Sequence, residues 1–242
     1  TKQPTQTATA TNSQTQQVPN PALYALTNEG WVPYWIISKQ KVSGIFSEVM
    51  TELNSRTANE LIPITPLPPK RAQLRFKSGA IHIECCVNLQ WRKEEGESDV
   101  SLWSNTLMEV EEVLLFPKGK HFPFEKLVDL SGKSIATILG YGYVGEQYFN
   151  RNDSLNNISL VKMLAAKRSD AAIIDRNELN HMMQNNTEFR DIMKMVDVGP
   201  VINTSELKLR IHQSRPELLA PINKALAEMR NDGTLSRIIE RY

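Results

Sequence analysis

Residues 129–147 read DLSGKSIATILGYGYVGEQ and combine a turn, an apolar run and a glycine-rich loop. The composition of 129–133 is that of a turn, and 134–139 has the length and apolarity of a buried strand. The glycine-rich stretch 140–145 (GYGYVG) follows, and we expect a helix to run from it through Gln147. A strand, a glycine loop and a helix in this order are typical of α/β proteins with parallel strands.

The glycine loop matches the pattern G-x-G-x-x-G at Gly140, Gly142 and Gly145, for which three interpretations remain open. A dinucleotide site also needs an acidic residue about 20 positions further on, and the region around Ala165 offers lysines but no acid. Alternatively, small residues let a carboxylate or phosphate approach the N–H groups at a helix N-terminus. The third interpretation is a tight turn without a ligand. We favour an anion-binding loop at 140–143 and expect no cofactor.

The rest of the chain alternates between strand-like and helix-like segments, which extends the α/β prediction to the whole protein. We expect a strand near 23–25, a turn at 28–30 and an aromatic loop at 31–37. Further strands are predicted at 61–65, 81–87, 110–116, 158–161, 170–175 and 207–212. Helices are predicted at 45–54, 70–78, 161–167, 179–183, 218–229 and 235–242.

Charge and composition exclude several classes of protein. Lys and Arg number 28 against 27 Asp and Glu, and this net charge of +1 argues against a nucleic-acid-binding protein. Hydrophobic residues make up 40% of the chain, which is ordinary for a globular protein. No stretch approaches the roughly 18 apolar residues of a membrane span. The two cysteines also exclude a small disulfide-stapled protein.

The first 22 residues differ from the remainder, because they are rich in Thr and Gln and carry one charged residue, Lys2. With so few apolar groups, such a segment cannot offset the entropy lost on ordering. We therefore expect residues 1–22 to form a disordered tail that remained after removal of an export signal. An arbitrary boundary within a disordered tail is the alternative.

The cysteines Cys85 and Cys86 are neighbours in the sequence. Adjacent Cα atoms lie about 3.8 Å apart, below the usual disulfide range of roughly 4.4–6.8 Å. We therefore favour two reduced, partly buried thiols, and keep a vicinal disulfide beside the ligand site as the alternative. His82, Glu84 and Cys86 alternate along the same predicted strand, which allows a metal site. We favour polar residues at the mouth of a strand and expect no metal.

Aromatic residues gather at Trp31, Tyr34 and Trp35, where Pro33 keeps the segment irregular. They form either part of the core or a platform on which a ligand stacks. The four histidines are scattered, and a G-x-S-x-G elbow is missing from the sequence, so nucleophilic catalysis has no positive support.

Six stretches, in this order along the chain, resemble the periplasmic (extracellular) solute-binding proteins of ABC importers, family 3, the class that binds polar amino acids. The stretches are 30–34 (GWVPY), 43–49 (SGIFSEV), 76–83 (FKSGAIHI), 129–140 (DLSGKSIATILG), 168–175 (RSDAAIID) and 223–234 (NKALAEMRNDGT). The chain departs from the family pattern at His82, which replaces an Asp, and at 89–92 (LQWR), which replaces T-x-x-R.

The resemblance implies a type II periplasmic-binding-protein fold, in which two Rossmann-like α/β lobes are joined by a two-strand hinge. In such a fold the lobes close on a solute held between them. The chain would cross out near 108–112 and return near 203–207. Lobe 1 would then contain residues 23–109 and 206–242, and lobe 2 residues 110–205.

The resemblance also implies a set of ligand-binding residues. Trp31 would stack on the ligand, Asp175 would bind its α-ammonium group, and Arg92 would clamp a carboxylate with a bidentate guanidinium. The glycine loop would present N–H groups and side chains to a carboxylate. The full predicted site is Trp31, Tyr34, Arg92, Gly140, Tyr141, Gly142, Tyr143 and Asp175.

The function implied by this resemblance is capture of a small polar solute, an amino acid or related carboxylate, for import through an ABC permease. We expect an exported, periplasmic monomer without enzymatic activity, and a lipid anchor stays open. One alternative is an enzyme of the cyclohexadienyl-dehydratase type, with Glu29, Glu84 and Asp175 as acid/base candidates. A sensory ligand-binding domain without a transport role is the other.

Overall fold

The computed structural model describes residues 20–39 and 41–242. Most of the predicted tail, 1–19, therefore lies outside the described residues. Of its last three residues, Ala22 already begins the first strand, and the guanidinium of Arg215 binds the carbonyl oxygens of Asn20 and Pro21.

The structure contains ten strands and seven α-helices among the described residues. The strands are β1 (Ala22–Tyr24), β2 (Ile36–Ile37), β3 (Val42–Ser43), β4 (Leu61–Pro63), β5 (Ile83–Val87), β6 (Ser101–Pro117), β7 (Ser134–Ile138), β8 (Asn150–Ser154), β9 (Ala171–Asp175) and β10 (Val196–His212). The helices are α1 (Ile45–Arg56), α2 (Pro69–Lys77), α3 (Asn157–Ala165), α4 (Arg176–Asn185), α5 (Thr187–Met193), α6 (Leu219–Asn231) and α7 (Thr234–Glu240). A 3₁₀ turn, η1 (Leu89–Trp91), follows β5.

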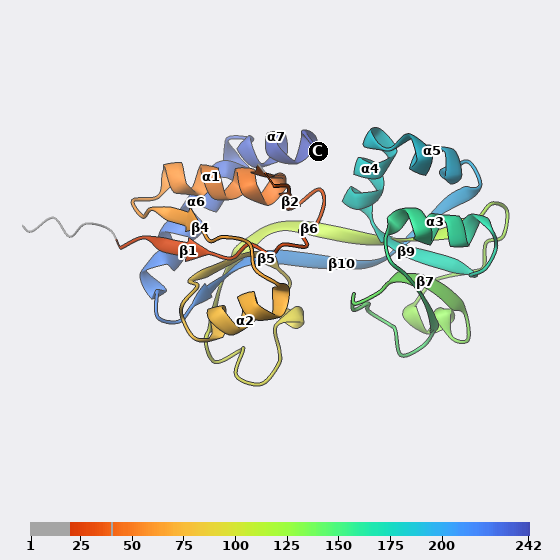
Figure 1. The fold of residues 1–242 in the computed structure, drawn as a ribbon, viewed down its shortest axis with the longest axis horizontal. Helices are drawn as coiled ribbons and strands as arrows, with labels where there is room; N and C mark the ends of the chain where they lie inside the picture. Colours follow the sequence, from red (N-terminus) through yellow and green to blue (C-terminus); the bar gives the residue numbers. More distant parts are fainter. Residues whose placement is uncertain (1–19, 40) are drawn as a thin grey trace, which may run out of the picture.

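One eight-stranded sheet runs through the molecule in the order β4-β1-β5-β10-β6-β9-β7-β8 (Figure 1). Strand β1 is parallel to β4 and β5, and β7 is parallel to β8 and β9. The three central pairings, β5 with β10, β10 with β6 and β6 with β9, are antiparallel. The α/β fold class is confirmed, although the expected parallel arrangement holds only toward the two ends of the sheet.

The elements form two groups connected by the long strands β6 and β10 (Figure 1). We call lobe 1 the group formed by β1, β4, β5, α1, α2, α6 and α7, and lobe 2 the group formed by β7, β8, β9, α3, α4 and α5. Strands β6 and β10 have 17 residues each and pair from Ser101↔His212 to Pro117↔Val196. The sequence predicted only the later part of each strand, 110–116 of β6 and 207–212 of β10. The first part of each strand, 101–109 and 196–206, mixes polar and apolar residues without a continuous apolar run.

Each lobe has a hydrophobic core of its own. In lobe 1 the predicted stripe of α1 is confirmed, since Ile45, Phe46, Val49, Met50 and Leu53 are all buried. Each of these side chains contributes about 1.5–3 kcal/mol when fully buried. The core of lobe 2 forms where α3, α4 and α5 pack on the sheet, around residues such as Leu160, Leu164 and Phe189.

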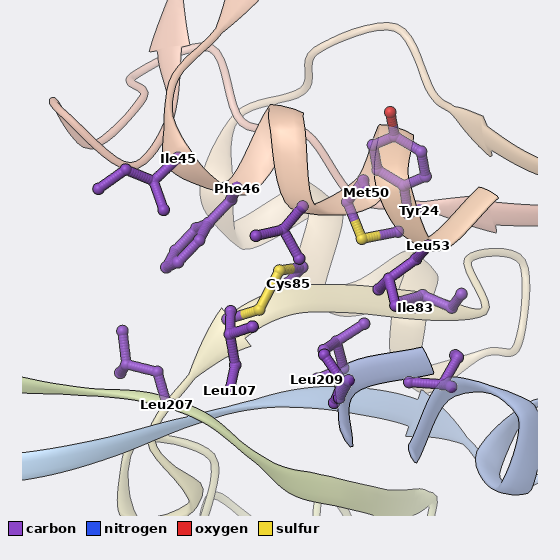
Figure 2. Packing of buried hydrophobic residues seen from close by; sticks show 14 of the residues in the cluster. Tyr24, Ile45, Phe46, Met50, Leu53, Ile83, Cys85, Leu107, Leu207 and Leu209 are labelled. Atoms are coloured by element: carbon purple, nitrogen blue, oxygen red, sulfur yellow. A yellow bond between two sulfur atoms is a disulfide. The ribbon is translucent and has the colours of Figure 1, made fainter. Parts of the chain in front are cut away.

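The two cysteines form a disulfide, so the favoured expectation of two reduced thiols is wrong. That expectation rested on the usual Cα separation of disulfides, whereas here the two sulfur atoms are bonded although the Cα atoms lie only 3.0 Å apart. The disulfide is buried in the core of lobe 1, among side chains that include Phe46, Leu107 and Leu207 (Figure 2).

Candidate functional site

A buried hydrogen bond joins the two lobes. The hydroxyl of Tyr34, a fully buried core residue of lobe 1, lies 2.9 and 3.0 Å from the two carboxylate oxygens of Asp175 at the end of β9. The side-chain amide of Asn177 donates a hydrogen bond to the same hydroxyl at 2.9 Å. Residues that are 141 positions apart in the chain therefore meet where the sequence predicted a ligand. We call the surroundings of this bond the interlobe site.

The aromatic residues of lobe 1 lie next to this bond. The ring centroids of Trp31 and Tyr34 are 4.2 Å apart, and Trp91 of η1 meets Trp31 edge to face at 6.0 Å. Tyr34 also packs on Phe46, with centroids 5.0 Å apart. Tyr34 therefore belongs to the core, while Trp31 is half-buried and Trp91 keeps 41% of its surface exposed. The core interpretation is confirmed for Tyr34 and Trp35, and a stacking platform at Trp31 stays a prediction.

Asp175 is positioned by helix α4, for which it is the N-cap residue. Its carboxylate accepts hydrogen bonds from the backbone N–H groups of Asn177 at 2.8 Å and Glu178 at 3.0 Å. Such bonds satisfy the free N–H groups of a first helical turn and favour negative charge there. Burial nevertheless raises the pKa of Asp175 above its ordinary value, and these N–H groups and Tyr34 oppose the rise.

Two further acids, Glu178 and Glu112, lie at the interlobe site, and neither was predicted from the sequence. Glu178 stands in the first turn of α4 with 8% of its surface exposed. Glu112 is the direct cross-strand partner of Asp175 in the β6–β9 ladder, so both side chains leave the same face of the sheet. The D-x-x-E spacing from Asp175 to Glu178, which places an acid in the first turn after an N-cap, was the available signal for Glu178.

The three carboxyl groups of the interlobe site influence one another. Burial, followed by the charge of Asp175, raises the pKa of Glu178 to about 8, against opposing effects of Trp31 and Asn157. Burial and the same charge raise the pKa of Glu112 to about 7. One oxygen of Glu112, Oε2, is buried and has no hydrogen-bond partner in the part of the chain that the structure describes. Burial is thus the largest cause in all three groups, and the charge of Asp175 adds to it at Glu112 and Glu178.

The glycine-rich loop corrects a second prediction, because no helix begins at Gly140. Strand β7 ends at Ile138, and residues 140–147 form turns and loop. Three glycines within six residues disfavour a helix, and Gly145 adopts a positive φ of 82°. The hydroxyl of Tyr143 instead fixes the loop by accepting a hydrogen bond from the N–H of Ile138 at 2.9 Å. The helix N-terminus on which the anion-binding interpretation depended is therefore absent.

The tyrosines of this loop are nevertheless close to the acids. Burial, followed by the charges of Glu178, Glu29 and Asp175, raises the pKa of Tyr141 to about 12. The pKa of Tyr143 is raised as well, by burial first and then by neighbours that include Glu112 and Glu178. The space around Gly140 and Gly142 is open, since a Cβ atom at either position would meet nothing within 4 Å. Ligand binding by residues 140–143 stays a prediction.

Arg92 is held by a carboxylate of its own lobe. Its Nε and Nη2 atoms donate to Glu84, and Nη1 donates to the carbonyl oxygen of Trp91 at 3.0 Å. Glu84 is shared with Arg210, which is fully buried and donates to it at 3.2 Å. Burial alone would raise the pKa of Glu84, but the two guanidinium groups lower it below its ordinary value. All three guanidinium nitrogens of Arg92 are thus engaged, and its role as a carboxylate clamp stays a prediction.

The residues considered for a metal do not converge. Nδ1 of His82 accepts a hydrogen bond from the backbone N–H of Leu23 at 2.9 Å, Glu84 binds arginines, and Cys86 is part of the disulfide. Throughout 20–39 and 41–242, no three His, Cys, Asp or Glu side chains are grouped so that they could hold a metal ion.

The lobes, the two connecting strands and the interlobe site together define a class of protein. The model of the bacterial extracellular solute-binding proteins, family 3, matches residues 23–242, and the chain belongs to this family. The family consists mainly of non-enzymatic proteins that bind small solutes. No curated protein matches the chain. Within the described part of the chain, no helix has the length and apolarity that a membrane crossing requires.

Solved structures share the fold at low sequence identity. An ancestral arginine-binding protein bound to arginine is 19% identical, with a TM-score of 0.63 over 92% of this chain and 97% of the other. A histidine kinase sensor domain with similarity to periplasmic binding proteins is 16% identical, with a TM-score of 0.70 over 93% and 96%. The second substrate-binding domain of a putative amino acid ABC transporter from Streptococcus pneumoniae is 14% identical, with a TM-score of 0.64 over 92% and 99%.

Proposed function

We propose that this protein is a periplasmic solute-binding protein that captures a small polar solute, an amino acid or a related compound, between its lobes for ABC-type import. The observation that carries this proposal is the buried contact of Tyr34 with Asp175, which joins the two lobes at one carboxylate. The family and the amino-acid transporter domain that shares the fold support it.

The proposed mechanism is closure of the lobes around the solute. The lobe boundaries would be those expected from the sequence, with residues 23–109 and 206–242 in lobe 1 and 110–205 in lobe 2. Trp31 of lobe 1 would stack on the solute, and Asp175 of lobe 2 would accept hydrogen bonds from its ammonium group. Because closure removes water from this contact, each hydrogen bond and charge pair there becomes stronger.

A sensory role is the second candidate, and it has support of its own. The histidine kinase sensor domain has the same fold over nearly the whole chain. A sensor and a carrier require the same closure on a ligand, so the interlobe site serves either role. Co-purification with a permease supports import, whereas ligand-dependent binding to a kinase in place of a permease supports sensing.

The binding role is tested by a thermal-shift screen of L-amino acids and related amines, followed by calorimetry of each solute that raises the melting temperature. Asp175→Asn keeps the N-cap of α4, because Asn is also a good capping residue, but removes the charge. We expect this variant to lose at least about tenfold in affinity, or roughly 1.4 kcal/mol. Glu109→Gln, an exposed change on β6, is the matched control and should bind like the parent.

Two outcomes contradict the proposed function. If Asp175→Asn binds every solute as tightly as the parent protein, the interlobe site does not hold the ligand. If a bound solute is turned over, the enzymatic alternative replaces simple capture. Among the acid/base candidates for such chemistry, Glu84 is already engaged by Arg92 and Arg210.

A further inference from the structure

We infer that the interlobe site selects small organic cations, either amines or guanidinium compounds, and does not require a carboxylate on the ligand. This inference rests on the proposed function and narrows its substrate class. The contacts that carry it are the acids at the end of β9, the partners of Arg92 and the aromatic rings of lobe 1.

The interlobe site gathers negative charge that no described cation balances. Glu112, Asp175 and Glu178 come together there, and among the residues that the structure describes none of the three pairs with a Lys, Arg or His. The arginine that follows Asp175 in the chain, Arg176, forms its ion pair with Glu111 at 2.7 Å. A buried carboxylate without a counter-charge is costly. A ligand that supplies positive charge removes this cost and so binds preferentially.

The acids of the interlobe site can also accept hydrogen bonds from a ligand. Among the described residues, Oε2 of Glu112 is buried and has no hydrogen-bond partner. Glu178 is more than nine-tenths buried, and its hydrogen-bond partners are the neutral side chains of Trp31 and Asn157. Asp175, by contrast, already accepts two backbone N–H groups and the Tyr34 hydroxyl. An ammonium group has three donors and a guanidinium has five. Such a group can therefore donate to Oε2 of Glu112 and also balance the charge of Glu178 and Asp175, whereas a neutral or anionic ligand leaves that charge uncompensated.

The two features that were predicted to bind a ligand carboxylate, Arg92 and the glycine loop, are poorly suited to it in this structure. Arg92 uses all three of its guanidinium nitrogens on Glu84 and Trp91. Releasing it would leave Glu84, which is buried, with Arg210 as its remaining cation. The loop at 140–147 contains no helix, so it provides no helix N-terminus for an anion. The site thus favours the cationic end of a ligand over its anionic end.

Lobe 1 contributes an aromatic surface that suits an organic cation. Trp31, which forms a hydrogen bond with Glu178, is partly exposed, and Trp91, which is exposed, meets it edge to face. Aromatic faces attract organic cations through the quadrupole of the ring, and Trp does so best. A bare metal ion is disfavoured, because the acids described here are not grouped as metal ligands.

Matched pairs of solutes test the inference by calorimetry at about pH 8, where both raised carboxyl groups are at least half ionised. The pairs are L-arginine with agmatine and L-lysine with cadaverine, in which the second member lacks only the carboxylate. L-glutamine and L-glutamate represent neutral and anionic solutes. We expect at least one of the two amines to bind at least as tightly as its parent amino acid, and L-glutamate to bind at least about 100-fold more weakly.

The possible outcomes separate the inference from the proposed function. If amino acids bind while their decarboxylated partners do not, the inference is overturned and solute capture stands. The same holds if L-glutamine or L-glutamate binds more tightly than the cations. If the protein binds none of these solutes, the inference is overturned, and failure of the wider screen would overturn the proposed function as well.

Charge-removing variants supply the second arm. Glu112→Gln and Glu178→Gln preserve shape, and each should weaken binding of the best cation by about tenfold or more. Glu109→Gln, exposed on the same strand as Glu112, is the matched control and should leave affinity unchanged. Circular dichroism verifies that each variant is folded. If both Gln variants bind the cation like the parent protein, the acids do not recognise it and the inference is wrong.

Discussion

Two groups of buried acids differ in how their charge is balanced. In lobe 1, Glu84 is surrounded by Arg92, Arg210 and the side-chain amide of Gln73, and its pKa is lowered. At the interlobe site, Glu112 and Glu178 form no ion pair with a described Lys, Arg or His, and their pKa values are raised to about 7 and about 8. The same residue type is buried in both places, with opposite results.

The difference shows which group serves the fold and which suits a ligand. A buried acid with two guanidinium partners is complete within the protein, so its removal should damage the structure. A buried acid without a counter-charge weakens the protein that carries it, and strain of this kind is typical of functional sites. Substitutions in the two groups should therefore change stability in opposite directions.

Glu84→Gln should be the most damaging change. Arg210, which is fully buried, would keep only Glu97 as an acidic neighbour, at 3.7 Å. Breaking a buried ion pair in this way typically costs about 3–5 kcal/mol of the free energy of unfolding. Urea denaturation measures the loss, and Glu95→Gln at an exposed position is the control. A loss below about 1 kcal/mol would show that the Glu84 network contributes little.

Glu178→Gln should have the opposite sign. The substitution removes a buried carboxylate whose ionisation is disfavoured, so at about pH 8 we expect a gain of about 1–2 kcal/mol in the free energy of unfolding. The same variant should bind cations more weakly, which is the usual trade between stability and function. The same denaturation measurement applies, and a loss as large as that of Glu84→Gln would remove the distinction between the two groups of acids.

The two groups of acids should also differ in how their contribution to stability depends on pH. Because Glu112 and Glu178 have raised pKa values, the folded protein binds more protons than the unfolded chain between about pH 4.5 and pH 8. Their contribution to stability is therefore present at low pH and is lost as the pH rises through this window. Glu84, with a lowered pKa, contributes stability above its ordinary pKa and loses it as the pH falls.

Denaturation at a series of pH values tests this expectation. The double variant Glu112→Gln/Glu178→Gln should lose less stability than the parent protein between about pH 5 and pH 8. The loss of stability at low pH, to which Glu84 contributes, should be the same in this variant as in the parent protein. Identical profiles for the two proteins would contradict the raised pKa values.

Tyr34→Phe should have the smallest effect. It removes the hydroxyl that joins the lobes but keeps the ring that packs on Trp31 and Phe46. Loss of one buried hydrogen bond costs about 1 kcal/mol, and the pKa of Asp175 should rise further because a donor is lost. Tyr148→Phe, at an exposed position, is the control. A destabilisation no larger than that of the control would mean that the hydroxyl does not hold the lobes together.

Local patterns predicted much of this molecule. The apolar stripes of α1 and α6 are buried as expected, and Asp175 lies at the end of a buried strand. The residues expected at 158–161 as a strand belong instead to α3, because Asn156 caps a helix there. Strand β8 was missed since its sequence, NRNDS, is polar throughout and has no alternation to recognise.

The composition of the site was harder to predict for a physical reason. Glu111 and Glu112 are neighbours with the same chemistry, and only the register of β6 against β9 places Glu112 opposite Asp175. Likewise, the sequence suggested a guanidinium at Arg92 but could not show that Glu84 engages it. Contacts between side chains distant in the sequence decide both cases, whereas periodicity reports only on the local chain.

The way the chain crosses between the lobes has a consequence for its synthesis. The core of lobe 1 includes Ala22 near one end of the chain and Ile238 near the other, whereas the core residues of lobe 2 lie between them. A nascent chain leaving the ribosome therefore presents every strand and helix of lobe 2 before α6 and α7 exist. Until those two helices arrive, the buried face of α1 lacks part of its cover and is exposed to aggregation or to chaperones. Lobe 1, although its first half is made first, is the last to be completed.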